Sequence, residues 1–104
     1  MDWSLSNVTF HFPELDPVIA YLVENLGEDW KNLARALEFS EVDIAEISLH
    51  NRQLREKGRA MLNEWRKRRE GDHEEARQTL ITALRNKYVK LNQFAYKIDK
   101  KLIP

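Results

Sequence analysis

Two tryptophan-bearing helical patterns constrain this chain more than any other feature. The first places four residues on one helix face at the spacing i, i+3, i+4 and i+7: Trp30, Leu33, Ala34 and Leu37. The second repeats the arrangement on a later helix with Met61, Leu62 and Trp65. Because a tryptophan buries a large aromatic surface, two of them on inner helix faces predict the centre of one small helical bundle.

Start and stop signals divide the main body into six expected helices. Asp16 followed by Pro17 is typical of a helix start, with the aspartate as N-cap and the proline at the first helical position. Gly27 ends this helix, since glycine adopts a left-handed conformation without steric cost. We expect helices at 17–26 and about 28–38, a short one opened by a near capping box of Ser40 and Asp43, one at about 53–70 closed by Gly71, one capped by Asp72 and Glu75, and a last one starting near 88–90.

The expected fourth helix contains a glycine on its apolar stripe. That stripe consists of Leu54, Gly58, Met61, Leu62 and Trp65. A glycine inside a helix costs about 1 kcal/mol relative to alanine, and a neighbouring helix packed too close for a side chain would explain it. The domain organisation that we expect is an extended or disordered leader at 1–13, one helical domain at 14–100 and a tail at 101–104.

Composition limits the partners and the compartment. The chain has no cysteine and no apolar run of the ~20 residues that a membrane span requires, and it shows no secretory leader. We therefore expect a cytoplasmic protein that does not insert into membranes. Residues 1–51 carry two basic and ten acidic side chains, whereas residues 52–104 carry fifteen basic and seven acidic ones. Such a division of charge favours complementary docking between proteins. The alternative is that each half simply solvates its own surface.

No residue pattern is typical of an enzyme. His11, His50 and His73 are far apart and lack metal-ligand spacing. There is no nucleophile elbow, and the isolated glycines form no phosphate-binding loop. We expect no catalysis, no metal and no cofactor.

A basic cluster on the expected fourth helix is the main candidate for binding. Arg55, Arg59 and Arg66 fall together on a helical wheel, with Arg52 just beyond them. The run of Arg66, Lys67, Arg68 and Arg69 adds positive charge at the helix C-terminus. Three interpretations stay open: a solvated face that complements the helix dipole, contact with nucleic acid, and a protein-docking surface with bidentate arginine–carboxylate bonds. The acidic counterpart lies in or beside the expected third helix: Glu38, Glu41, Asp43 and Glu46.

The segment Gly27-x-x-Trp30-x-x-Leu33-Ala34, together with Trp65 on the fourth helix, resembles the death domain of apoptotic and innate-immune adaptors. The resemblance covers about residues 15–98 and includes adaptors of the Fas-associated and immune-deficiency type. It implies an all-α fold, a six-helix antiparallel bundle with Greek-key topology. The signature of death-effector domains is missing, and caspase-recruitment domains do not usually carry this tryptophan pair.

The resemblance also implies how such a domain assembles. One surface of a death domain meets an opposite surface of its neighbour, which here would place Arg52, Arg55, Arg59 and Arg66 against Glu41, Asp43 and Glu46. A second contact would join the end of the fourth helix, Arg68 to Glu70, to the loop from Asn86 to Lys90, which contains Lys87. A third would use His50, Asn51 and Arg52.

We therefore expect an intracellular signalling adaptor that binds other death-domain proteins and assembles an oligomeric platform, with self-association as a further contact. Two alternatives remain. One is the death domain of a scaffold or receptor protein that acts as a passive structural module. The other is a helical nucleic-acid-binding domain, which the neutral net charge of the chain disfavours.

Overall fold

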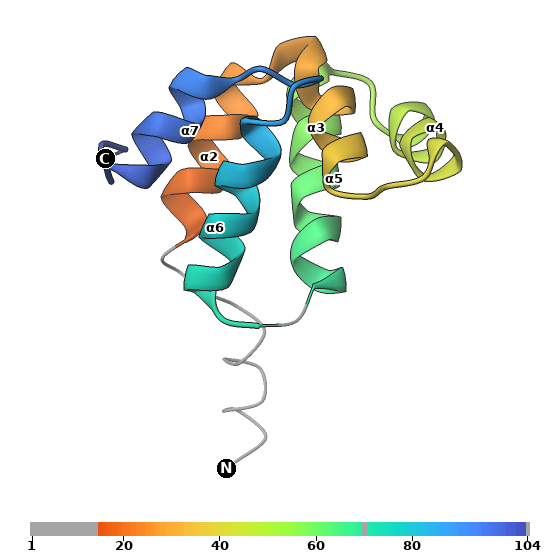
Figure 1. The fold of residues 1–104 in the computed structure, drawn as a ribbon. Coiled ribbons are helices and arrows are strands. Elements are labelled where there is room, and N and C mark those ends of the chain that lie inside the picture. The colour runs from red at the N-terminus through yellow and green to blue at the C-terminus, as the bar shows by residue number, and fades with distance from the viewer. Residues whose placement is uncertain (1–14, 70, 104) are drawn as a thin grey trace.

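The computed structural model describes residues 15–69 and 71–103, and this part of the chain is helical throughout its regular structure (Figure 1). The elements are α2 (Asp16–Asn25), the short 3-10 helix η2 (Gly27–Asp29), α3 (Trp30–Ala36), α4 (Glu41–His50), α5 (Leu54–Arg68), α6 (His73–Leu84) and α7 (Asn92–Asp99). The six predicted α-helices and the all-α class are confirmed. Within the described residues, none of the helices has the length and apolar character needed to cross a membrane.

The core forms around α5, which packs against α2, α3 and α4, while α6 packs against α7 and α3. Trp30 from α3 and Trp65 from α5 are both buried in one hydrophobic cluster, as the paired patterns predict. Each fully buried large side chain stabilises the fold by about 1.5–3 kcal/mol relative to an exposed one. Burial of both indoles therefore fixes α3 and α5 in the same interior.

Local capping rules predict several helix ends correctly. Ser40 Oγ accepts a hydrogen bond from the backbone N–H of Asp43 at 3.0 Å, and the Asp43 carboxylate accepts one in return from the N–H of Ser40 at 3.3 Å. Asp72 and Glu75 form the same reciprocal pair at the start of α6. Gly27 has a φ of 54° directly after the end of α2, which is the left-handed conformation expected there.

Other helix ends differ from the prediction. Asp16 is not an N-cap: it is the first residue of α2, Leu15 precedes it, and the Asp16 carboxylate binds Arg66. The expected helix at 28–38 begins instead as η2, and its α-helical part spans only Trp30–Ala36. The α-helix of α5 ends at Arg68, and α7 begins at Asn92. The predicted leader at 1–13 lies outside the described residues.

Two positions of the predicted α5 stripe behave differently from the rest. Leu54 is 42% exposed and so does not belong to the core. Gly58 is buried and faces Trp30, but a Cβ atom added to it would lie 3.9 Å from the Trp30 Cβ, an ordinary van der Waals contact. The expectation that a neighbour leaves no room for a side chain is therefore wrong for a methyl group.

Candidate protein-interaction surface

Helix α5 carries most of the basic residues from which the sequence predicts a docking surface. The helix starts after Gln53, where the Glu56 carboxylate accepts hydrogen bonds from the backbone N–H groups of Arg52 and Gln53, both at 3.2 Å. Because the buried face of α5 packs on its neighbours, one flank of the helix lies beside α2 and the other beside α4. This placement decides which arginines meet a carboxylate of their own chain.

On the α2 flank, two of the three clustered arginines are bound within the molecule. Arg55 Nη2 lies 2.7 Å from the Glu24 carboxylate, and Arg66 Nη1 lies 3.1 Å from Asp16 Oδ1. The Arg66 side chain is only 14% exposed. Arg59 is exposed, and among residues 15–69 and 71–103 it has no hydrogen-bond or ion-pair partner. The predicted cluster is therefore one free cation between two paired ones.

On the α4 flank, Arg68 joins three groups. Its guanidinium donates to Asp43 Oδ2 and to Glu64 Oε2, each at 3.0 Å, and lies 4.6 Å from the centre of the Phe39 ring. The hydrogen bond to Asp43 raises the pKa of Arg68, and the same bond lowers the pKa of the half-buried Asp43. Asp43 and Arg68 were predicted to face other molecules, but in this structure they bind each other.

Some of the other predicted acidic residues are bound within the molecule and others are not. The Glu41 carboxylate accepts two hydrogen bonds from Arg35, at 2.8 and 3.2 Å, which lower the pKa of Glu41 and raise that of Arg35. Glu46 is exposed on α4 and has no cationic partner in the described part of the chain. Glu38 is exposed as well, so within residues 15–69 and 71–103 Glu38 and Glu46 are the predicted acidic residues that meet no cation of their own chain.

The remaining predicted basic residues lie on the outer surface. Arg69 lies over the Trp65 ring at 5.5 Å, and Lys87 lies over the Tyr88 ring at 5.0 Å. Three more are exposed and meet no carboxylate within residues 15–69 and 71–103: Arg52, Lys67 and Lys90. Arg59 and Lys67 on α5, with Arg52 just before the helix, form what we call the free basic face of α5.

Sequence reasoning missed one cation that organises this surface. Lys57 Nζ donates to the carbonyl oxygens of Ser48 and Asn51, both at 2.7 Å, and to Ser48 Oγ at 3.2 Å. The end of a helix leaves carbonyl groups without partners, and a cation there also complements the helix dipole. Lys57 therefore caps α4 from a different helix. No signal in the sequence indicates this contact, because it depends on how α4 and α5 pack.

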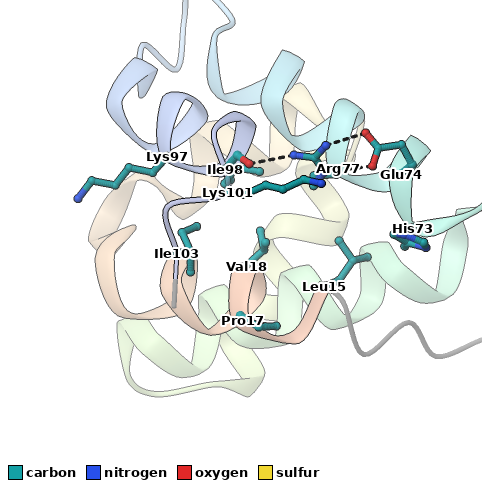
Figure 2. Close-up of a pocket in the computed structure, with 10 residues that line it drawn as sticks. All are labelled: Leu15, Pro17, Val18, His73, Glu74, Arg77, Lys97, Ile98, Lys101 and Ile103. Carbon is teal, nitrogen blue, oxygen red and sulfur yellow. Dashed lines mark hydrogen bonds and ion pairs between the residues drawn. The ribbon is translucent and has the colours of Figure 1, made fainter.

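Arg77 was also missed, and it lines a cavity on the surface. A cavity of about 360 Å³ lies where the start of α2, the start of α6 and the end of α7 meet (Figure 2). Arg77 donates to the Glu74 carboxylate at 2.7 Å and to the Ile98 carbonyl at 2.9 Å. These bonds join α6 to the end of α7, so we interpret Arg77 as a structural contact. The i, i+3 spacing of Glu74 and Arg77 is a signal that sequence analysis can use.

The chemistry available on this surface is ionic and hydrogen-bonding. Within residues 15–69 and 71–103, no three side chains of the types His, Cys, Asp and Glu are grouped so that they could hold a metal ion. What the described surface offers a partner is unpaired charge beside exposed apolar side chains.

Comparison with known proteins gives one match. A family model described as the death domain matches residues 16–99, which is well over half of the chain. No curated protein and no solved structure gives a significant match.

Proposed function

The chain belongs to the death-domain family, and from this premise we propose that it is a signalling adaptor that binds other death domains through complementary charge. Proteins of this family act through protein–protein interaction, not through catalysis. In this proposal residues 14–100 form the interaction domain, the protein works in the cytoplasm, and it brings downstream enzymes together in apoptosis or innate immunity. The gain for those enzymes is an increased effective concentration.

The observation that carries the proposal is the free basic face of α5. Arg52, Arg59 and Lys67 are exposed, and they meet no carboxylate in the described part of the chain. Arginine binds a carboxylate through two parallel hydrogen bonds, so these side chains suit an acidic partner surface. The pairs Arg55 with Glu24 and Arg66 with Asp16 hold α5 against α2, and they leave Arg59 exposed between them.

The paired residues are less suitable for a test of binding. Arg66 is largely buried in its contact with Asp16, and Asp43 caps α4 as well as binding Arg68. Charge reversal at Arg66 or Asp43 would disturb the fold and the surface together. Arg59 and Lys67 avoid this problem because both are exposed.

Reversal of charge on the free basic face is expected to weaken partner binding. Immobilised wild-type protein is incubated with cell lysate, captured proteins that contain a death domain are identified by mass spectrometry, and one of them is purified for affinity measurement. We expect Arg59→Glu and Lys67→Glu each to weaken that affinity by about tenfold or more, because like charges brought together across an interface cost several kcal/mol. Binding should also weaken with added salt, since the Debye length is only about 8 Å at physiological ionic strength.

The matched control is Lys100→Glu, which changes the net charge equally at an exposed residue after α7. Its affinity should stay at the wild-type value, and circular dichroism should show the same helix content in all variants. Equal affinity for wild type, Arg59→Glu and Lys67→Glu would contradict the proposal. The nucleic-acid alternative would be favoured by a different result. In that case the protein binds heparin, substitution of Arg52, Arg59 or Lys67 weakens this binding equally, and no death-domain protein is captured.

A further inference from the structure

The exposed apolar side chains of this protein concentrate at two places of opposite charge. Among the described large hydrophobic residues, Leu49 and Tyr88 are the most exposed, at 81% and 75%. Leu49 lies at the end of α4 and Tyr88 in the loop between α6 and α7. An isolated exposed apolar residue needs no explanation. The charges around Leu49 and Tyr88, however, indicate that these two residues belong to binding surfaces.

The outer face of α4 is apolar and acidic. Val42, Ala45 and Leu49 are spaced i, i+3 and i+7, so they form one exposed stripe on the side of α4 that faces away from α5. Helix α4 contains three carboxylates and neither lysine nor arginine. Arginines of other elements bind Glu41 and Asp43, so the acidic character of this face comes from Glu46. Figure 1 shows α4 at the edge of the bundle. A groove of about 460 Å³ runs beside this stripe, with Ala45 and Leu49 in one wall and Lys31 and the Glu41-bound Arg35 also lining it.

The loop at 85–91 is apolar and basic. It contains Arg85, Lys87 and Lys90 and no carboxylate. The loop is held in place by a buried Val89 and by hydrogen bonds from Tyr88 N to Asn86 Oδ1 at 2.8 Å and from Leu91 N to the Leu84 carbonyl at 2.9 Å. Tyr88 is therefore presented by a fixed backbone, and this lowers the entropy that binding must overcome.

We propose that the Tyr88 loop of one copy of this chain docks on the outer face of α4 of a second copy. In this contact Tyr88 packs against Val42 and Leu49 beside the small Ala45, and Lys87 approaches Glu46. Within the part of the chain that the structure describes, Glu46 is the α4 carboxylate without a cationic partner, since Glu41 binds Arg35 and Asp43 binds Arg68. The inference rests on the proposed function as an assembly module, and it names a self-contact of that module.

Charge selects this pairing over the two symmetric ones. Two α4 faces in contact would bring carboxylates together, and two Tyr88 loops in contact would bring lysines together; both arrangements are disfavoured. The α4–loop contact joins different surfaces, so one end of the assembly keeps an unused α4 face, the other end keeps an unused loop, and the chain of copies stays open. The few side chains involved suggest an interface below the roughly 800 Å² per partner of a stable complex, so the contact is expected to be weak and to act at high local concentration.

The apolar half of the contact is tested with two serine substitutions. Self-association of the full chain is measured by sedimentation velocity over a range of protein concentrations at low salt. Leu49→Ser and Tyr88→Ser are each expected to weaken self-association by about tenfold, in the lower range for a central interface residue. Leu102→Ser and Tyr96→Ser are the matched controls, because both residues are exposed and lie outside the two surfaces. The controls should self-associate like wild type.

The charged half is tested by an exchange of sign. Glu46→Lys and Lys87→Glu should each self-associate more weakly than wild type when measured alone. In an equimolar mixture, the reversed α4 of the first variant meets the reversed loop of the second, and the two unchanged surfaces also meet. The mixture is therefore expected to regain wild-type self-association, a result that a loss of folding in either variant does not produce.

Three results would overturn the inference. The first is a wild-type chain that stays monomeric at every concentration. The second is an equal loss of self-association in the test and control variants. The third is a mixture that self-associates no more strongly than either variant alone. If Leu49→Ser and Tyr88→Ser instead weaken binding only to a different death domain, the occupant is that partner and not a second copy. Each of these results leaves the proposed function standing as long as Arg59→Glu still weakens partner binding.

Discussion

Arginines on the same helix differ in what they are free to do. Arg68 is engaged by Asp43 and Glu64 and lies over the Phe39 ring, whereas Arg59 meets no carboxylate in the described part of the chain. The difference arises from neighbouring elements and not from the residue type. A formal charge count therefore overstates how many cations a partner can use.

The Gly58→Ala substitution is predicted to stabilise the protein. Alanine gains about 1 kcal/mol over glycine inside a helix, and its methyl group would meet the Trp30 Cβ at an ordinary contact distance of 3.9 Å. Urea denaturation should show a higher midpoint with an unchanged slope. Gly58→Leu serves as the contrasting variant, because its longer side chain must displace Trp30, and it should destabilise. A lower midpoint for Gly58→Ala would show that α3 and α5 cannot admit even a methyl group.

At the scale of elements, α4 is held at both ends by polar contacts. The capping box of Ser40 and Asp43 and the Asp43–Arg68 bond fix its start, and Lys57 binds the carbonyl groups at its end. Its apolar contribution to the core is small, since Ile44 is the residue of α4 that is fully buried. We infer that α4 depends more on these hydrogen bonds than the other helices do.

Removal of the Lys57 ammonium group is expected to loosen α4. Lys57→Met keeps the apolar stem and leaves two carbonyl groups without their donor, and a lost hydrogen bond to a charged group costs about 1.5–3 kcal/mol. Amide exchange should accelerate in residues 44–51 more than in α6. Lys67→Met is the control, because Lys67 is an exposed lysine on the same helix. Uniform acceleration in α4 and α6 would instead indicate a global loss of stability.

Sequence reasoning succeeded where the determinants of an element are local. The capping boxes, the end of α2 at Gly27 and the two tryptophan stripes all depend on residues within a few positions of each other. It failed at Asp16, which pairs with Arg66 fifty residues later and does not cap its own helix. It also failed to find Lys57. Ion pairs between helices depend on packing that periodicity does not encode, so the candidate site was predicted less completely than the fold.

At the scale of the whole molecule, ion pairs connect the acidic and the basic halves of the chain. Arg55 with Glu24, Arg66 with Asp16 and Arg68 with Asp43 each join residues from different halves. Part of the opposite charge of the two halves is therefore neutralised by ion pairs inside the molecule. The remainder, which includes Glu46 and the free basic face of α5, is left for other molecules.

Acid is predicted to weaken the fold through three carboxylates. Arginine hydrogen bonds lower the pKa of Asp43, Glu41 and Glu74 below their ordinary values of 3.8 for Asp and 4.5 for Glu. A lowered pKa in the folded state contributes stability above the ordinary pKa, and this stability is lost as the pH falls through the lowered one. The difference in unfolding free energy between wild type and Asp43→Asn should thus be largest near neutral pH and shrink in strong acid. A constant difference across that range would exclude the charge of Asp43 as its source.

The internal neutralisation of arginine also affects how fast a partner arrives. A guanidinium whose field is cancelled by a carboxylate 3 Å away exerts little pull on a molecule that is still diffusing. Long-range attraction therefore comes from the unpaired cations, and these orient an approaching acidic surface toward the outer side of α5 before any contact forms.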